Sequence, residues 1–418
     1  MSDFFQNGNV STLHNLTRRS VEDIEAELVN FSSNRPIGLV LPSLYSELEA
    51  PALENIVSEL AKVPYLSRIV IGLDRANADE FAHAKEYFSR LPQDHVVIWH
   101  DGPRMQALDE ELAALSLAPP ELGKGRNVWY CFGYMLAARD VFAIGLHDCD
   151  IVTYDRSLLA RLMYPVVNPV FPYVFAKGYY PRIDGEKLGG RVTRLLITPL
   201  LAALRKVCGD NSYLRFLDSF RYPLAGEFAM RSHVVADIRI PSDWGLEIGV
   251  LSEVRRNYSN RVIAQVDIAD NYDHKHQDLS ADDRSSGLSR MSSDISTSLY
   301  RILATFGSVF ETGTVRTVKA AYLRIALDLI ESYYNDAVVN GLRFDRDAEE
   351  RAVETFASNV LTSGQDFLQS GQEVPYVPSW NRVLSVYPGA PQELADIVAK
   401  DYEEFAEPSV IEVTAASG

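Results

Sequence analysis

Two carboxylates, two residues apart, follow an apolar run in the first half of the chain. Asp148 and Asp150 flank Cys149, and the run at 141–146 is typical of a buried strand. Ligands of open α/β sheets bind beyond the carboxyl ends of the strands. A turn there would let one acid bind a divalent ion while the other holds the ligand, and Mg²⁺ favours few carboxylates together with phosphate oxygens. The pattern predicts a site for a metal and a nucleoside diphosphate, with a solvated turn as the alternative.

Two loops carry features that suit a nucleotide. The loop after the apolar residues 37–41 begins with Pro42 and contains Glu47, so backbone amides and a carboxylate could line a base and ribose pocket. A plain strand-to-helix connection is the alternative. In the stretch 122–127, Lys124 lies between two glycines ahead of a helical pattern, which suits an anionic group. Its spacing is not that of a Walker motif.

A third segment has the groups that bind a phosphate. Gly190, Arg191 and Thr193 open a helical pattern at 191–208. Backbone amides of a helix start, a guanidinium and a hydroxyl therefore come together. The alternative interpretation is an ordinary helix start with an exposed arginine.

A fourth segment offers imidazoles. After an apolar run at 261–268, the loop 272–277 contains His274 and His276. A neutral imidazole from that loop could join the coordination of a metal held by Asp150. Histidines in a charged loop can also be simply solvent-exposed.

The elements that must position these residues alternate between strand and helix patterns, which predicts a parallel α/β sheet with right-handed crossovers. The expected strands are 37–41, 69–73, 95–99 and 141–146, with helices at 51–63, 80–89 and 127–139 between them. Further on we expect strands at 170–177 and 261–268 and helices at 191–208, 246–256, 298–306, 315–339, 347–361 and 392–405.

This pattern suggests three regions. Residues 1–35 are expected to be an N-terminal extension with a helix at 21–31, residues 36–287 a ligand-binding catalytic domain, and residues 288–418 a helical C-terminal region. The polar segment 278–293 is the best candidate for a mobile linker or lid.

Bulk composition excludes several classes of protein. The 418 residues are 47% hydrophobic and 23% charged, as in an ordinary globular protein. A net charge of −17 argues against a nucleic-acid partner. We find neither an apolar run long enough for a membrane helix nor a signal-peptide pattern. Three scattered cysteines argue for a reducing compartment, so the expected location is cytoplasmic.

Taken together, several short stretches resemble one family. They are Leu41-Pro42-Ser43-Leu44, Gly123-Lys124-Gly125, Asp148-Cys149-Asp150, Gly190-Arg191-Val192-Thr193, Pro223-Leu224-Ala225-Gly226-Glu227, Gly245-Leu246-Glu247-Ile248-Gly249 and the loop around His274. In this order they resemble the glucosyl-3-phosphoglycerate and mannosyl-3-phosphoglycerate synthases, and more distantly mannosylglycerate synthase. Those enzymes are retaining nucleotide-sugar transferases of the GT-A fold. The resemblance implies a Rossmann-like, nucleotide-binding mixed sheet.

The resemblance also implies roles for individual residues. The metal, Mg²⁺ or Mn²⁺, would be bound by Asp150 and His274. The donor would be bound by Pro42, Ser43, Leu44, Glu47, Lys124, Asp148, Cys149, Asp150 and Glu247. The acceptor would be bound by Gly190, Arg191, Thr193 and His276. Catalysis would involve Asp150, Glu247 at the sugar hydroxyls, and Leu224 through its backbone carbonyl.

The expected reaction moves glucose from a nucleoside-diphosphate sugar, UDP-glucose by default, to the 2-hydroxyl of 3-phosphoglycerate with retention of configuration. Ala225 stands where the family has glycine, and Lys275-His276-Gln277 replaces an Arg-Asn-Arg run, so the acceptor stays open. The alternatives are mannose as the sugar, another acceptor such as glycerate, glycerol or a lipid phosphate, and a catalytically silent nucleotide-sugar-binding protein. We further expect a homodimer, with no membrane or nucleic-acid partner.

Overall fold

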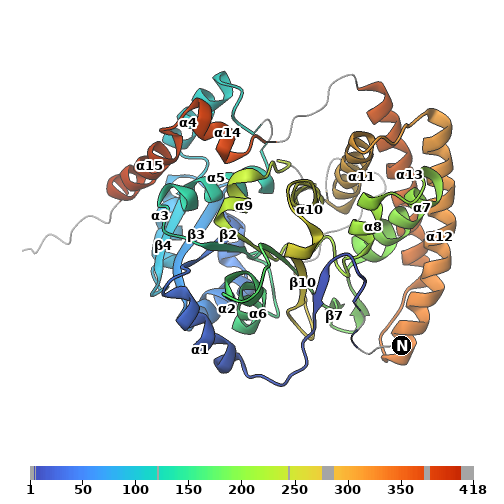
Figure 1. The fold of residues 1–418 in the computed structure, drawn as a ribbon, viewed down its shortest axis with the longest axis horizontal. Coiled ribbons are helices and arrows are strands. Elements are labelled where there is room, and N and C mark those ends of the chain that lie inside the picture. Colours follow the sequence, from blue (N-terminus) through green and yellow to red (C-terminus); the bar gives the residue numbers. More distant parts are fainter. Residues whose placement is uncertain are drawn as a thin grey trace, which may run out of the picture.

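A mixed sheet of eight strands forms the centre of the computed structural model, which describes residues 4, 6–119, 122–242, 245–274, 287–370 and 377–405 (Figure 1). The strand order is β1-β10-β6-β9-β5-β2-β3-β4. The strands are β1 (Ser11–Leu13), β2 (Ile37–Leu44), β3 (Leu66–Asp74), β4 (Asp94–Trp99), β5 (Ala143–Leu146), β6 (Phe175–Tyr179), β9 (Phe228–Arg231) and β10 (Ile263–Asp267). Only β9 among these strands runs antiparallel to its neighbours, β5 and β6.

Helices cover both faces of this sheet, so its inner strands are apolar on both sides. In β2, Leu39 and Leu41 belong to one apolar cluster and Val40 to the other. One face carries α1 (Val21–Ser32), α2 (Pro51–Leu60), α3 (Ala78–Phe88) and α6 (Arg156–Val167). The other carries α4 (Pro103–Ala114), α5 (Lys124–Ala137), α9 (Ser232–Asp237) and α10 (Leu246–Asn257). The continuous apolar runs of the sequence follow from this double coverage.

One strand direction brings the ligand loops together. Because every strand except β9 points the same way, the segments after β2, β3, β4, β5, β6 and β10 meet at one edge of the sheet. The segment that precedes the antiparallel β9, which contains Leu224, begins at the same edge. The ligand loops, from the one that begins at Pro42 to the one that contains His274, therefore lie at the same edge of the sheet.

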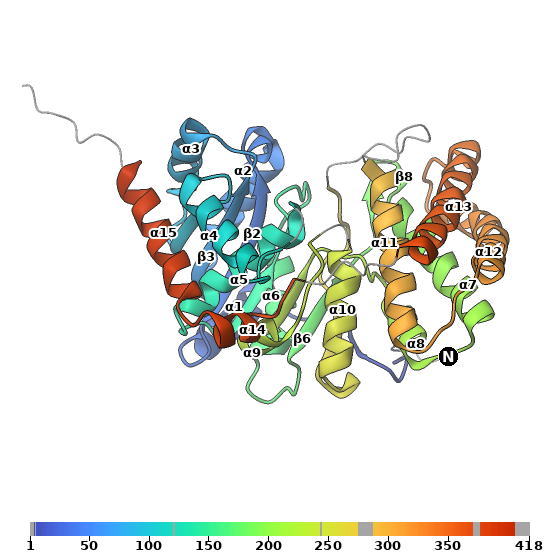
Figure 2. The same ribbon diagram turned by 90° about the horizontal axis from the view of Figure 1, so that it is seen from above.

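A layer of helices lies beside this sheet, on the right in Figures 1 and 2. It contains η2, a π-helix (Val192–Ile197), and α7 (Thr198–Cys208), α8 (Ser212–Asp218), α11 (Gly287–Thr305), α12 (Thr312–Val339) and α13 (Arg346–Gln369). The Tyr322 hydroxyl of α12 donates to the Leu195 carbonyl oxygen at 2.6 Å. The small hairpin β7 (Ile183–Asp184) and β8 (Lys187–Leu188) lies next to this layer and pairs with Arg343.

The last part of the chain returns to the other end of the sheet. It forms α14 (Trp380–Val386) and α15 (Ala390–Glu404), and Figure 2 shows α15 on the β3 and α3 side. The Trp380 and Trp129 rings stack with centroids 4.3 Å apart. A side chain at Gly133 would lie 2.0 Å from the Trp380 ring, so this position requires glycine. The Tyr402 hydroxyl accepts a hydrogen bond from the Val97 amide of β4 at 2.8 Å.

The structure corrects one expectation about the linker. Residues 287–293, part of the expected mobile segment 278–293, are the first turns of α11; residues 275–286 lie outside the described part of the chain. The serines there are not loop residues. Ser289 and Ser292 are buried, and both hydroxyls accept hydrogen bonds from the Asn359 side chain of α13. The polar composition therefore suggested a loop, although the segment is a helix whose serine side chains pack against α13.

The other elements agree with the sequence pattern within a few residues, with three exceptions. The strand expected from 170 begins at Phe175. The helix expected at 298–306 is Gly287–Thr305, and the one expected at 347–361 is Arg346–Gln369. Elements with short or weak patterns, such as β1, α4, α6, α8 and β9, were not foreseen.

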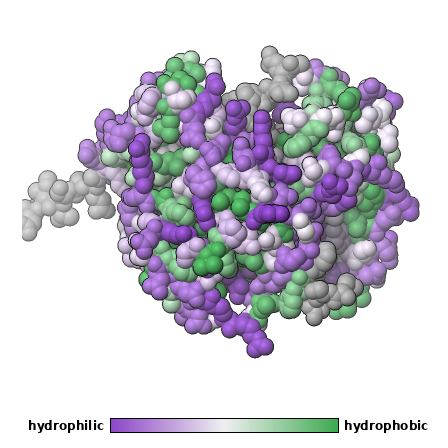
Figure 3. Space-filling model, viewed as in Figure 1, coloured by the Kyte–Doolittle hydropathy of each residue, from purple (hydrophilic) through white to green (hydrophobic). Residues whose placement is uncertain are grey.

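The face shown in Figure 3 is mostly hydrophilic with smaller apolar patches. No helix in the described ranges is both long and apolar enough to cross a bilayer.

Candidate active site

A cavity of about 620 Å³ opens at the edge of the sheet where the ligand loops meet. It extends from the ends of β2 and β5 to η2 and the helices α11 and α13. Every described residue that the sequence assigned to a site lines it. These are Pro42, Ser43, Leu44, Glu47, Lys124, Asp148, Cys149, Asp150, Gly190, Arg191, Thr193, Leu224, Glu247 and His274. His276 lies outside the described residues.

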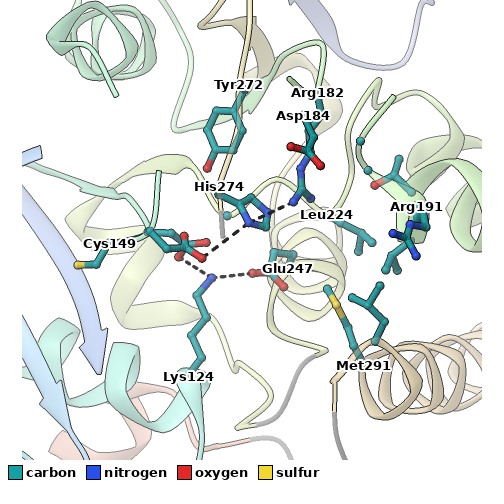
Figure 4. Close-up of a pocket in the computed structure, with 18 of the residues that line it drawn as sticks. Lys124, Cys149, Arg182, Asp184, Arg191, Leu224, Glu247, Tyr272, His274 and Met291 are labelled. Carbon is teal, nitrogen blue, oxygen red and sulfur yellow. Dashed lines mark hydrogen bonds and ion pairs between the residues drawn. The ribbon is translucent and has the colours of Figure 1, made fainter. Parts of the chain in front are cut away.

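One lysine joins two of the acids. The Lys124 ammonium lies 2.7 Å from Asp148 Oδ1 and 3.1 Å from Glu247 Oε1 (Figure 4). Burial would raise the pKa of the Asp148 carboxyl, but the charge of Lys124 outweighs it and holds that pKa below its usual value. Burial likewise opposes the charge on Lys124, and the two carboxylates raise its pKa above the usual value. Lys124 and Asp148 are therefore both charged at neutral pH, and the ammonium joins Asp148 to Glu247.

Two glycines allow this cluster to form. Lys124 is the first residue of α5, and a side chain at Gly125 would lie 1.9 Å from the Pro241 carbonyl oxygen. A side chain at Gly226 would lie 2.3 Å from Asp148 Oδ2. Close packing therefore requires both glycines, Gly125 against the Pro241 backbone and Gly226 against the Asp148 carboxylate.

Asp150 and His274 lie side by side, with 3.7 Å between Asp150 Oδ2 and His274 Nδ1. The backbone explains how residues so distant in sequence meet. Ile151 forms a β-bridge with His274, and the Val152 amide donates to the Asp273 carbonyl oxygen at 2.8 Å. The structure therefore brings together the two residues that the resemblance assigned to a metal.

This pair fits a hard divalent cation. Burial and the nearby Asp148 raise the pKa of the Asp150 carboxyl to about 7, so a cation would stabilise its ionised form. Within the described ranges, no group of three or more His, Cys, Asp or Glu side chains could hold a metal ion. Mg²⁺ commonly uses one or two protein ligands and completes its shell with water and phosphate oxygens. Two side chains beside an open cavity match that preference.

A buried glutamate supports the segment that carries His274. The Glu227 carboxylate accepts hydrogen bonds from the Tyr180 hydroxyl at 2.6 Å and the Tyr272 hydroxyl at 2.7 Å. The two tyrosine rings stack with centroids 3.7 Å apart. Since Tyr272 precedes His274 by two residues and Tyr180 precedes Arg182 by two, Glu227 fixes both segments at the middle of the cavity.

At the far end of the cavity, Gly190, Arg191 and Thr193 start the helix. Gly190 has φ +67°, a left-handed conformation that favours glycine. The Thr193 hydroxyl is buried and has no hydrogen-bond partner in the described part of the protein. The Arg191 side chain is exposed to the cavity, and no described carboxylate lies within ion-pair distance of it. These donors could bind an anion.

A second arginine, outside the sequence motif, holds this loop in place. Arg194 donates to the carbonyl oxygens of Gly189 at 2.7 Å and Leu188 at 3.1 Å. It also forms a two-pronged ion pair with Glu349 of α13, at 2.8 and 3.2 Å. The helical C-terminal region therefore helps to shape the anion-binding end.

Sequence reasoning missed several residues that line the cavity. They are Asp74, Arg75, Asp101, Arg126 and Asn127 at one end, Tyr180, Arg182, Asp184, Tyr222 and Tyr272 in the middle, and Leu288, Arg290, Met291, Arg343, Phe344 and Glu349 at the other. Asp74 and Asp101 could have been found, because both stand at the ends of strands, as Asp148 does. Burial raises the pKa of Asp74 to about 6, against a hydrogen bond from the Asn127 amide.

Comparison with known proteins gives a consistent result. No family model matches the chain. The glucosyl-3-phosphoglycerate synthase of Persephonella marina is 46% identical over 401 residues, which cover 96% of this chain and 99% of that protein. The enzyme of the same name from Methanococcoides burtonii is 38% identical over 411 residues, covering 97% and 99%.

Solved structures support the fold class expected from the sequence. Glucosyl-3-phosphoglycerate synthase of Mycobacterium tuberculosis, in complex with Mn²⁺, UDP-glucose and phosphoglyceric acid, has a TM-score of 0.52 at 23% identity, over 70% of this chain and 87% of that one. Mannosyl-3-phosphoglycerate synthase from Rubrobacter xylanophilus has a TM-score of 0.53 at 20% identity, over 72% and 83%. The GT-A-like α/β fold with a helical C-terminal region is thereby confirmed.

Proposed function

The chain belongs to the glucosyl-3-phosphoglycerate synthases, and we propose that it performs their reaction in the cavity described above. It is a glycosyltransferase that moves glucose from UDP-glucose to 3-phosphoglycerate. The observation that carries the proposal is the joining of two sites in one cavity. The Asp150–His274 pair suits a metal and a diphosphate, and the Gly190–Thr193 helix start suits the phosphate of the acceptor.

The donor end of the cavity would bind the nucleotide sugar. Asp150 and His274 would hold Mg²⁺ or Mn²⁺, ions that are present with UDP in complexes of the Mycobacterium tuberculosis enzyme. When bound, such an ion supplies positive charge to the leaving diphosphate. The other donor contacts come from Pro42, Ser43, Leu44, Glu47, Lys124, Asp148, Cys149 and Glu247.

The acceptor end would orient the nucleophile. With its phosphate on the Gly190 and Thr193 donors and Arg191, 3-phosphoglycerate would turn its 2-hydroxyl toward Leu224, which lines the same cavity. Holding two reactants in this way lowers the barrier by several kcal/mol. Asp148 and Glu247 are engaged by Lys124, and Glu227 by two tyrosines, so these carboxylates are not placed as nucleophiles. We therefore infer substitution with retention on one face, in which the leaving diphosphate takes the hydroxyl proton.

The product tests this proposal. The protein is incubated with 3-phosphoglycerate, Mg²⁺ and an equal mixture of UDP-glucose, GDP-glucose and GDP-mannose, and the products are identified by mass spectrometry. We expect glucosyl-3-phosphoglycerate together with UDP. A mannosyl product, or nucleotide binding without turnover, would support the alternatives considered from the sequence.

Two further properties are part of the same proposal. We infer a homodimer that forms through the helical region, where Tyr334, Val338 and Val339 at the end of α12 are exposed apolar side chains. Light scattering coupled to gel filtration measures the mass in solution, and the mass of a single chain would contradict the homodimer.

We also infer a cytoplasmic location, because the three cysteines are free thiols, which a reducing compartment maintains.

A further inference from the structure

Arg182 spans the distance between the two parts of the cavity. It stands in the segment after β6 and pairs with Tyr272 in a β-bridge. Its aliphatic stem packs on the helix start, because a side chain at Gly189 would lie 2.8 Å from its Cγ and one at Gly190 would lie 3.8 Å from its Cδ. Its guanidinium Nη2 lies 3.1 Å from His274 Nδ1. Figure 4 shows the side chain pointing at His274.

The guanidinium of Arg182 lacks a protein anion. In the described ranges no carboxylate forms an ion pair with it, and its Nε is buried without a hydrogen-bond partner. Its contact with His274 is to an imidazole nitrogen, which must be the acceptor because a guanidinium can only donate. A metal bound to that nitrogen would take the same lone pair and release the guanidinium for another acceptor. Burial opposes the charge of this half-buried guanidinium, but nearby Tyr222, Tyr180 and Tyr272 outweigh it and raise the pKa of Arg182, so the side chain is charged and can bind an anion.

Three other arginines near the acceptor end are already engaged. Arg343 lies 2.9 Å from Glu186, Arg290 lies 3.7 Å from Asp294, and Arg194 is paired with Glu349. These cations are neutralised by the protein itself. Arg182 differs from them because its donors face the cavity between the metal pair and the phosphate-binding helix start.

The covalent structure of the acceptor brings a second anion close to the reacting hydroxyl. In 3-phosphoglycerate, the carbon that carries the reacting hydroxyl is bonded directly to the carboxylate on one side and to the phosphate-bearing carbon on the other. If the phosphate rests on the helix start and the hydroxyl faces the donor, the carboxylate stays close to the hydroxyl, because both are attached to the same carbon, and it lies in the middle of the cavity toward which the Arg182 guanidinium points. The donor diphosphate would repel it there, so a cation is needed.

On the basis of the proposed function, we propose that Arg182 binds the carboxylate of the acceptor and thereby selects phosphorylated hydroxy acids over phosphorylated alcohols. The planar guanidinium matches a carboxylate with two parallel hydrogen bonds. Its two Nη atoms are the donors for this contact, because Nε is buried. The chemical class of the ligand is therefore a short 2-hydroxycarboxylate with a phosphate on the next carbon.

The test compares two ligands that differ in the carboxylate alone. Binding of 3-phosphoglycerate and of glycerol 3-phosphate is measured by calorimetry in the presence of UDP and Mg²⁺, for the wild type and for Arg182→Met, which keeps the length but removes the charge. We expect affinity for 3-phosphoglycerate to fall about 100-fold and that for glycerol 3-phosphate to change less than about threefold. Arg182→Lys should recover part of the preference for 3-phosphoglycerate over glycerol 3-phosphate, because it restores the positive charge but not the planar pair of donors.

Arg191→Met is the matched control. Because both ligands carry a phosphate, this variant should weaken both by a similar factor. The inference is overturned if Arg182→Met weakens both ligands equally, or if it weakens UDP binding as much as 3-phosphoglycerate binding, since Arg182 would then serve the donor or the fold. Failure of the wild type to transfer glucose to 3-phosphoglycerate would instead contradict the proposed function, and it is measured separately.

Discussion

The two ends of the cavity handle charge in opposite ways. At the donor end, Lys124 lies between Asp148 and Glu247, and Asp74 accepts a hydrogen bond from Asn127 at 3.0 Å. At the acceptor end, neither Arg182 nor Arg191 has a carboxylate partner in the described part of the chain. At the first end the acids outnumber the cations that could neutralise them, and at the second these two cations have no carboxylate partner in the described part of the chain.

This difference indicates what each end can bind. Acids in excess over bases, as at Asp148 and Asp150, favour a ligand that arrives with a divalent cation. Cations without protein partners favour an anion that arrives alone. A chain with net charge −17 can therefore bind an anionic acceptor, because the local charge near Arg191 is opposite to the mean charge.

The largest expected effect comes from breaking the donor end. Asp150→Ala removes one of the two groups proposed to hold the metal. We expect kcat/KM for glucosyl transfer to fall on the order of 1000-fold or more, because the leaving diphosphate loses its counter-charge. The measurement is the initial rate of UDP release at saturating Mg²⁺. Asp270→Ala, an exposed acid before the Tyr272 segment, is the control and should keep wild-type rates. Full activity of Asp150→Ala would end the metal assignment.

The next effect belongs to the acceptor end. Arg191→Ala should raise the apparent KM for 3-phosphoglycerate about 100-fold, since a charge-assisted contact to the phosphate is lost, while the KM for UDP-glucose changes less than about threefold. Steady-state kinetics with each substrate varied in turn separates the two. Arg205→Ala, on the same helix but paired with Asp210 and Asp218, is the control. A loss confined to donor use would show that the two ends have been assigned the wrong way round.

A smaller effect concerns the donor end alone: the stability of the protein should depend on pH through Asp74. Burial raises the pKa of Asp74 to about 6, so the unfolded chain releases this proton before the folded protein does. The free energy of unfolding should therefore decrease as the pH rises from about 4 to 6. Above that range Asp74 is ionised in both states, so the stability lost remains constant. Asp74→Asn keeps a hydrogen-bond acceptor for Asn127 and removes the ionisation.

We expect Asp74→Asn to match the wild type near pH 4 and to be more stable by about 2 kcal/mol at pH 7.5. Urea unfolding at the two pH values measures the difference. If the difference in stability between the variant and the wild type is the same at both pH values, Asp74 does not titrate in this range. Its ionisation then does not lower the stability of the folded protein.

The sequence was sufficient for residues that stand at strand ends. Asp148 and Asp150 follow β5, and Lys124 and Arg191 lie at the starts of helices, so periodicity and the direction of parallel strands place them at one edge. These features are local, and their positions follow from the fold class. That is why every described residue of the expected site lines one cavity.

The sequence was insufficient for residues whose role depends on distant partners. Glu227 is 47 residues from Tyr180 and 45 from Tyr272, and nothing in the local pattern indicates that their side chains meet. Ser289 and Ser292 were interpreted as loop residues because their hydroxyls are polar, whereas packing against Asn359 makes them part of a helix. Tertiary contacts decide such positions.

The smallest expected effect concerns the link between the helical region and the acceptor end. Glu349 lies 155 residues after Arg194, and the ion pair between them holds the carbonyl oxygens of Leu188 and Gly189 through the same guanidinium. Glu349→Gln removes the negative charge but keeps one acceptor. We expect the KM for 3-phosphoglycerate to rise about 10-fold, because the loop before Arg191 is held less firmly.

Glu350→Gln is the control for this variant, since the neighbouring Glu350 pairs with Arg346 on the same helix and not with Arg194. A general loss of stability would lower kcat and raise both KM values, whereas a loosened loop raises the acceptor KM and leaves the donor KM within about twofold. Steady-state kinetics and thermal unfolding of the two variants together distinguish these outcomes. If Glu349→Gln behaves as Glu350→Gln does, the helical region does not contribute to acceptor binding, and the contrast between the two ends arises from the sheet and η2 alone.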